Sequence, residues 1–306
     1  MKAFPNTNTL KTLVIGGCGF IGKSLLKAYQ HLNIPASGTH YKESFYYKKL
    51  DLCEPNLDSL DIQANEFSHA IISAGFSNVF FCEKNPQITH QINVRGTLRL
   101  IEQLCERNIV PVLCSSSYVF DGILGSYEEA ALVNPLNEYG KQKAELEREI
   151  SLRFDKMVLL LRLGKVFGLE KGDGTLLDEM IKSLLGKKKI CAAYDQIFCP
   201  IAMDDLIAQI VQLQKINARG LYHVCGDEVW SRLDLAKILC QALCINPDII
   251  EPISLDDLEE AVLRPKRTDM INRKMFVTTG IKTKTLLSSI EHIACQYLKS
   301  NNYANE

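Results

Sequence analysis

Tyr139 and Lys143 combine the residue types and the spacing that a proton-transfer centre requires. Residues four apart in an α-helix lie on one face, one turn from each other. A free tyrosine has a pKa of about 10 and exchanges protons poorly at neutral pH, but a nearby ammonium group favours the phenolate and lowers that pKa. The pair therefore predicts a tyrosine acid–base centre. Because the chain has 11 tyrosines, a solvated helix face is the alternative.

The segment around the pair has the composition of a helix. Pro135 and Asn137 suit a helix start, and residues 141–150 are mostly good helix formers. A hydroxyl group could lie nearby, because Ser115, Ser116 and Ser117 end an apolar run. A serine at the carboxyl end of a strand can point at a substrate carbonyl, although a serine run is also a common turn signal.

A glycine-rich turn near the amino terminus predicts a dinucleotide-binding site. Gly16, Gly19 and Gly22 follow the apolar run 12–15 and open a helical pattern over about 21–32. Glycines at this spacing permit a tight turn, close backbone approach to a diphosphate and close helix–sheet packing, and the helix start then binds the phosphates. Phe20 and Ile21 lie within the same turn and are included in the site. A purely structural turn is the alternative.

The end of the second expected strand, 34–41, bears on the choice of cofactor. NAD-selective sites usually place an acidic residue there to bind the ribose 2′-hydroxyl group. This chain has His40 and Lys42 instead, which tolerate a 2′-phosphate. The sequence therefore favours NADPH, while Glu43 keeps NADH as the alternative.

Further cofactor contacts are expected at the ends of neighbouring strands. Asp51 and Leu52, and then Ala74 and Gly75, stand where a chain leaving the sheet would meet the adenine and ribose. Ordinary loop chemistry explains these residues equally well.

Strand-like runs alternate with helical patterns along the chain, which predicts an α/β fold: a doubly wound, Rossmann-type parallel sheet with a smaller C-terminal substrate-binding lobe. We expect an NAD(P)-binding domain over 1–168 and the smaller lobe over 169–306, interleaved with the first. Further strands are expected at 69–73, 110–114 and 157–161, and helices at 87–107, 204–214 and 232–243. In such a sheet, binding sites lie at the carboxyl ends of the strands.

Composition excludes several classes of function. The 306 residues carry a net charge of −1, which gives no electrostatic case for binding nucleic acid or a membrane surface. The 11 cysteines are an odd number without a Cys-x-x-Cys motif, which indicates reduced thiols in a cytoplasmic protein. We find no signal peptide and no membrane-spanning run, and the six histidines show no metal-ligand spacing.

Together these motifs resemble the extended short-chain dehydrogenase/reductase family over nearly the whole chain. The matching segments are Gly16-x-x-Gly19-x-x-Gly22, Asp51-Leu52, Asn93-Val94-Arg95-Gly96-Thr97, Ser115–Ser117, Tyr139-x-x-x-Lys143 and 163–168. Within the family, residues 118–122, Asp195-Gln196 and Arg264-Pro265 are most similar to the reductases of nucleotide-linked 4-keto-6-deoxysugars.

The resemblance implies a role for each matching residue. Ser116 would hydrogen-bond the substrate carbonyl, with Ser117 beside it, and Tyr139 would donate a proton as hydride reaches C4 of the sugar. Lys143 would bind the cofactor ribose and lower the pKa of Tyr139. Asn93 would support the cofactor site.

The resemblance also concerns the substrate and the assembly. It implies that Arg264, Lys266 and Arg267 clamp the nucleotide diphosphate, which is dTDP in the leading interpretation; an exposed basic loop is the alternative. Family habit implies a homodimer.

Two other functions stay open. Asn93-Val94-x-Gly96-Thr97 and Arg267-x-Asp269 are also similar to nucleotide-sugar epimerases, which return the hydride to their substrate. The same fold serves as a non-catalytic, nucleotide-binding regulatory subunit of methionine adenosyltransferase. A 4,6-dehydratase is disfavoured, because Ser117-Tyr118 replaces the Asp-Glu pair that eliminates water.

Overall fold

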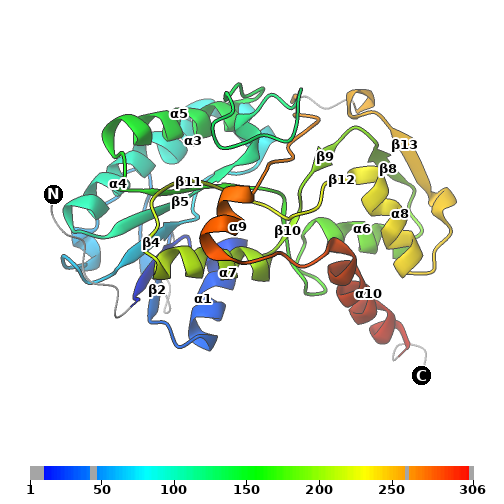
Figure 1. Cartoon of the computed structure of the whole chain (residues 1–306), viewed down its shortest axis with the longest axis horizontal. Helices are drawn as coiled ribbons and strands as arrows, with labels where there is room; N and C mark the ends of the chain where they lie inside the picture. The colour runs from blue at the N-terminus through cyan, green and yellow to red at the C-terminus, as the bar shows by residue number, and fades with distance from the viewer. Residues whose placement is uncertain (1–9, 42–46, 259–261, 303–306) are drawn as a thin grey trace. The chain divides into compact units, whose positions relative to one another are not determined.

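A seven-stranded sheet is the framework of the first of two compact units (Figure 1). The computed structural model describes residues 10–41, 47–258 and 262–302. The strand order is β11-β6-β5-β4-β1-β2-β3, and the pairs β1–β2, β1–β4, β2–β3 and β4–β5 are parallel. The strands are β1 (Thr12–Ile15), β2 (Ala36–His40), β3 (Lys48–Lys49), β4 (His69–Ile72), β5 (Val110–Ser116), β6 (Leu159–Leu163) and β11 (Gly220–Val224). The predicted doubly wound α/β sheet is confirmed.

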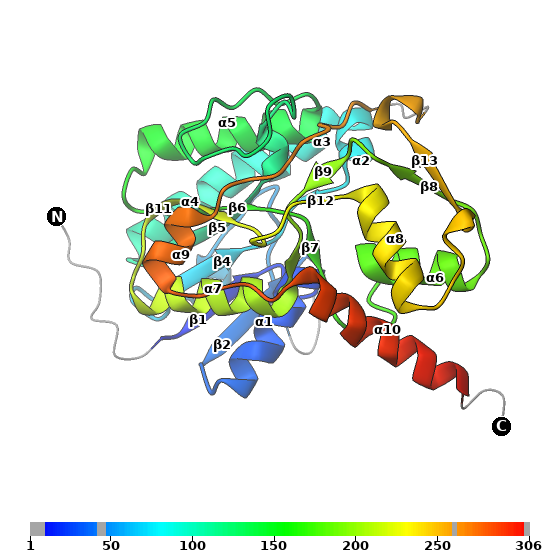
Figure 2. The same ribbon diagram turned by 45° about the vertical axis from the view of Figure 1, so that its right-hand side comes forward.

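Helices cover both faces of this sheet (Figure 2). α1 (Phe20–His31) and α7 (Met203–Lys215) lie on one face, and α4 (Thr97–Glu106) and α5 (Glu138–Arg153) lie on the other. α1 turns Gly22, Leu25 and Tyr29 inward, at the spacing of one helical face. Tyr29 connects α1 to α7, because its hydroxyl group donates to Gln214 Oε1 at 2.6 Å. Gln214 Nε2 in turn donates to Thr12 Oγ1 of β1 at 3.1 Å.

The single helix expected over 87–107 is wrong in one respect. The chain is helical without a break from α3 (Pro86–His90) to the end of α4, but a π-helical segment (Gln91–Gly96) lies between these two helices; α2 (Val79–Lys84) precedes them. Gly96 ends the π segment, and a Cβ atom there would lie 1.6 Å from the carbonyl oxygen of Leu52. The π turn therefore packs closely against Leu52. The spacing of apolar residues in the sequence predicts a helix here but does not predict a π turn within it.

The second unit comprises 121–131, 163–208 and 223–306, and the first comprises 1–120, 132–162 and 209–222. In the second unit, α6 (Leu176–Leu185), α8 (Arg232–Ala242) and α10 (Leu286–Asn302) pack together beside the parallel pair β8 (Ile190–Ala193) and β13 (Ile250–Ile253). Shorter elements of this unit are β7 (Val166–Phe167), β9 (Ile197–Phe198), β10 (Ile201–Ala202), β12 (Trp230–Ser231) and α9 (Arg273–Thr279), with 3₁₀ turns at Pro247–Ile249 and Leu255–Asp257. The first unit has 3₁₀ turns at Asp58–Leu60 and Ser117–Val119. None of the helices in the described residues has the length and apolar character needed to cross a bilayer.

His69 is a buried ionisable group at the opposite end of β4 from the predicted site. It is fully buried, its Nδ1 lies 3.0 Å from Ser68 Oγ, and its Nε2 has no hydrogen-bond partner among the described residues. Burial, and then the nearby charge of Arg219, lower the pKa of His69 from 6.5 to about 3. The folded protein therefore holds this imidazole neutral.

We expect this burial to make folding sensitive to mild acid. Below pH 6.5 the unfolded chain takes up a proton that the folded chain does not, so stability is complete above that pH and falls as the pH drops toward 3. Between pH 8 and pH 5, His69 should lower the free energy of unfolding by about 2 kcal/mol. Urea unfolding of wild type and His69→Asn at both pH values measures this; equal pH dependence of the two proteins would contradict it.

Candidate active site

Ser116, Tyr139 and Lys143 meet at the carboxyl end of β5, within the first unit. Ser116 is the last residue of β5, and its side chain lies near enough to Tyr139 to lower the pKa of the phenol in part. Lys143 Nζ donates to the carbonyl oxygen of Cys114 at 3.0 Å and lies 5.9 Å from the centre of the Tyr139 ring. The structure thus brings together the three side chains proposed for catalysis.

The start of α5 determines where this helix lies. Asn137 caps the helix by accepting from the N–H of Gly140 at 2.9 Å. A Cβ atom on Gly140 would lie 2.2 Å from the carbonyl oxygen of Tyr118, so only glycine allows the helix to approach so closely. The rings of Tyr118 and Tyr139 then pack edge to face, with 6.0 Å between their centres.

The protonation of the site differs from the sequence expectation. Burial raises the pKa of Tyr139 to about 12, and the Ser116 side chain opposes this only in part. Burial also lowers the pKa of Lys143. The pKa of Tyr139 is therefore raised in this structure rather than lowered as predicted, because desolvation of the phenolate is the largest influence on it. The neutral phenol that results is the form that donates a proton.

The glycine turn is suited to receive a diphosphate. Gly16 has φ = 92°, and a Cβ atom there would lie 2.9 Å from the backbone nitrogen of Ala74; a Cβ on Gly22 would lie 2.2 Å from the carbonyl oxygen of Gly16. Gly19 forms the N-cap of α1 without a side-chain cap, which leaves backbone N–H groups of the first turn for a ligand. The residues present therefore fit a dinucleotide.

Asn93 lies between the loop that follows β4 and helix α5. It is buried, its Oδ1 accepts from Phe76 N at 2.8 Å, and its Nδ2 donates to Phe76 O at 3.0 Å and to Gln142 Oε1 at 2.9 Å. Gly75, with φ = 137°, passes beside it; a Cβ atom there would lie 2.7 Å from Asn93 Oδ1. Asn93 thus connects the chain after β4 to the helix that carries Tyr139.

The other predicted cofactor residues lie at loop positions of the same unit. Asp51 accepts from the N–H of Cys53 at 2.8 Å, as in an ordinary turn, and Leu52 packs its carbonyl group on the π segment. His40 ends β2 and is half-buried. Lys42 lies outside the described residues, as does Glu43.

The basic residues predicted to bind substrate belong to the second unit. Arg267 forms an ion pair with the buried Asp269, with Nη2 and Oδ2 3.1 Å apart. Lys266 lies 2.9 Å from Asp195 and 2.5 Å from Asp256, so two carboxylates already offset its charge. Arg264 is exposed. Ser117, by contrast, is buried in the first unit, at the start of a 3₁₀ turn.

Sequence reasoning missed a polar network beside the candidate catalytic residues. Glu147, one turn after Lys143, pairs with Arg162 of β6 and accepts from Ser115 Oγ at 2.5 Å. The only available signal was its position four residues after Lys143. A glutamate in a helix is usually solvated, so that signal is weak.

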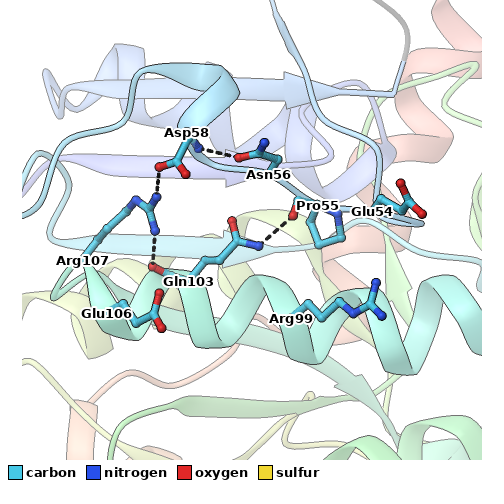
Figure 3. A pocket seen from close by; sticks show the side chains of 8 residues that line it. All are labelled: Glu54, Pro55, Asn56, Asp58, Arg99, Gln103, Glu106 and Arg107. Atoms are coloured by element: carbon cyan, nitrogen blue, oxygen red, sulfur yellow. Dashed lines mark hydrogen bonds and ion pairs between the residues drawn. The ribbon is translucent and has the colours of Figure 1, made fainter.

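A hollow on the first unit lies apart from these residues (Figure 3). Gln103, which lines the hollow, accepts from Leu57 N at 2.9 Å and donates to Pro55 O at 2.7 Å. Arg107 forms an ion pair with Asp58. None of its lining residues is a predicted site residue. Its hydrogen bonds fasten the loop after β3 to α4.

The sheet order, the glycine turn and the Ser–Tyr–Lys set define a Rossmann-type protein of the extended short-chain dehydrogenase/reductase kind. The chain belongs to the family described as the RmlD substrate binding domain, whose model matches residues 10–298.

Relatives within this group include enzymes and a subunit of another enzyme. The chain is 25% identical over 295 residues to dTDP-4-dehydrorhamnose reductase of Aggregatibacter actinomycetemcomitans, covering 92% of this chain and 98% of that protein. It is 24% identical over 293 residues to methionine adenosyltransferase 2 subunit beta of Bos taurus, covering 92% and 85%. The crystal structure of dTDP-4-dehydrorhamnose reductase from Bacillus anthracis, in complex with NADP, superimposes with a TM-score of 0.82 at 21% identity, covering 94% and 99%.

The close approach of α5 to Tyr118 can be tested with one methyl group. We expect Gly140→Ala to lower the melting temperature by at least 5 °C, because helix and turn must move apart by an amount that a packed core resists. Gly186→Ala is the matched control, since its Cβ would meet nothing nearer than 3.2 Å. Thermal unfolding measures both; equal melting temperatures would show that α5 does not depend on this contact.

Proposed function

We propose that this protein is an NADPH-dependent reductase of a nucleotide-linked 4-keto-6-deoxysugar, similar to dTDP-4-dehydrorhamnose reductase. The observation that carries the proposal is the meeting of Ser116, Tyr139 and Lys143 beside a glycine turn that fits a dinucleotide. The full-length similarity to a reductase of such a sugar supports the choice of substrate class. The nucleotide would be dTDP.

Each residue of the set has a chemical task in this reaction. NADPH, when bound, supplies the hydride that reduces the C4 carbonyl group. Ser116 donates a hydrogen bond to the carbonyl oxygen, and Tyr139 transfers its phenol proton to that oxygen as negative charge develops. Lys143 places a positive charge behind the tyrosine, which stabilises the phenolate left after proton transfer. The raised pKa of Tyr139 keeps the proton in place until then.

An epimerase is an alternative that uses Tyr139 in two ways. An epimerase must first use this tyrosine as a base, to take a proton from a sugar hydroxyl group, and only later as an acid. Burial raises the pKa of Tyr139 and leaves the neutral phenol as the resting form, whichever of the two reactions the site performs.

A non-catalytic regulatory subunit is the second candidate, and the similarity to methionine adenosyltransferase 2 subunit beta favours it. Such a protein needs a nucleotide site but no proton donor. The two functions therefore differ in what they require of Tyr139.

Removing the phenol hydroxyl should separate these functions. We expect Tyr139→Phe to lower kcat for NADPH oxidation with a nucleotide 4-ketosugar by 10²–10⁴-fold, roughly, because the proton donor is lost. NADPH should bind with little change, as measured by its fluorescence. Tyr194→Phe, at an exposed tyrosine of the second unit, should react like wild type.

The substrate panel combines the nucleotide 4-ketosugars, dTDP-linked members included, with NADPH and with NADH. Loss of absorbance at the nicotinamide band reports turnover. Cofactor binding without oxidation by any member would overturn the reductase proposal. Full biological effect of Tyr139→Phe would then support a regulatory subunit, and substrate interconversion without net cofactor oxidation would support an epimerase.

Cofactor preference should depend on the end of β2. We expect His40→Asp to weaken NADPH binding by at least about tenfold while NADH binding changes little, because a carboxylate repels the 2′-phosphate and accepts from a 2′-hydroxyl group. Dissociation constants from fluorescence titration measure both. The neutral control His40→Asn separates repulsion from a loss of packing; equal losses for both cofactors would contradict a contact at this position.

A further inference from the structure

A buried ion pair lies one helical turn behind the catalytic lysine. Glu147 of α5 and Arg162 of β6 have side chains that are 7% and 6% exposed. Arg162 Nη2 lies 2.7 Å from Glu147 Oε2, and its Nε lies 3.0 Å from the same oxygen and 3.2 Å from Oε1. Two buried charges with this geometry hold each other in one arrangement.

Ser115 extends the pair to the catalytic strand. Its hydroxyl group donates to Glu147 Oε1 at 2.5 Å, and Ser115 directly precedes Ser116. The guanidinium carbon of Arg162 also lies 5.1 Å from the centre of the Phe120 ring, just beyond the turn that follows Ser116. One network thus connects β5, the turn after it, α5 and β6.

The network does more than fill space. A buried ion pair can often be replaced by apolar side chains without loss of stability, so stability alone does not account for this one. What charged and hydrogen-bonded groups add over apolar packing is a defined alignment. Here the aligned elements carry Ser116 on one side and Tyr139 and Lys143 on the other.

We propose that Glu147 is a positioning residue, which uses Ser115 and Arg162 to hold α5 at the alignment on β5 that places Tyr139 and Lys143 beside Ser116. It acts through these side chains and touches no substrate. Its consequence for turnover rests on the proposed reductase function, whereas its consequence for Tyr139 does not.

The charge of Glu147 also affects Lys143. Burial lowers the pKa of Lys143, and the neighbouring groups that oppose this are Cys114 on β5, Glu147 on α5 and Cys82 on α2. Glu147 is the only carboxylate among them. Its alignment of α5 and its support for the charged lysine therefore act in the same direction.

Ser115→Ala tests the alignment, because it removes the connection to β5 and leaves the ion pair intact. We expect kcat for ketosugar reduction to fall about tenfold, while KM changes less than about twofold, since small displacements of reacting groups are costly. Ser115→Thr restores a hydroxyl group and should recover most of kcat. Glu149→Gln, at a carboxylate that pairs with the exposed Arg148, is the control and should leave kcat unchanged.

A second measurement follows Tyr139 without any substrate. In protein labelled with 3-fluorotyrosine, the fluorine signal that disappears in Tyr139→Phe reports the surroundings of this ring. We expect Ser115→Ala and Glu147→Gln to shift that signal, and Glu149→Gln to leave it in place.

The two measurements distinguish the possible failures. An unmoved fluorine signal in Ser115→Ala, or a lower melting temperature with unchanged kcat and fluorine signal, would overturn the positioning role. A shifted signal in a wild-type protein that reduces no ketosugar would support the positioning role and reject the proposed reductase function.

Discussion

The approach of α5 to the end of β5 is the contact on which the candidate site depends. Gly140 allows the helix to lie against the carbonyl oxygen of Tyr118, and the Asn137 cap starts the helix at the right residue. From that start, helical geometry places Tyr139 and Lys143 toward Ser116 and the carbonyl group of Cys114. A helix that began one residue later would turn both side chains by about 100°.

Polar side chains align α5 on both sides of the face that carries Tyr139 and Lys143. On one side, Gln142 accepts from Asn93 and donates to Thr89, which connects the helix to the segment after β4. On the other side, Glu147 connects it to β5 and β6. Hydrogen bonds and ion pairs are directional, whereas apolar contacts tolerate sliding. The position of the site residues is therefore determined by polar groups that contribute little to the hydrophobic core.

Local sequence rules predicted the parts of this molecule that local physics determines. The glycine turn, the start of α5 and the Tyr–Lys spacing each depend on a few neighbouring residues, and the structure has them as expected. Properties set by distant residues could not be predicted. The pKa of Tyr139 depends on how much protein surrounds it, and the pairing of Glu147 with Arg162 depends on how α5 packs against β6.

The burial that overturned the sequence expectation for Tyr139 also clarifies the chemistry. A low dielectric surrounding raises the pKa of the phenol and lowers that of Lys143. Loss of the tyrosine proton creates a negative charge beside the lysine, and the two buried charges then stabilise each other. In the proposed reaction the attraction becomes strong only as the proton leaves, so it would assist the transition state more than the resting protein. The same burial thus raises the resting pKa of Tyr139 and strengthens the attraction that would follow proton transfer in the proposed reaction.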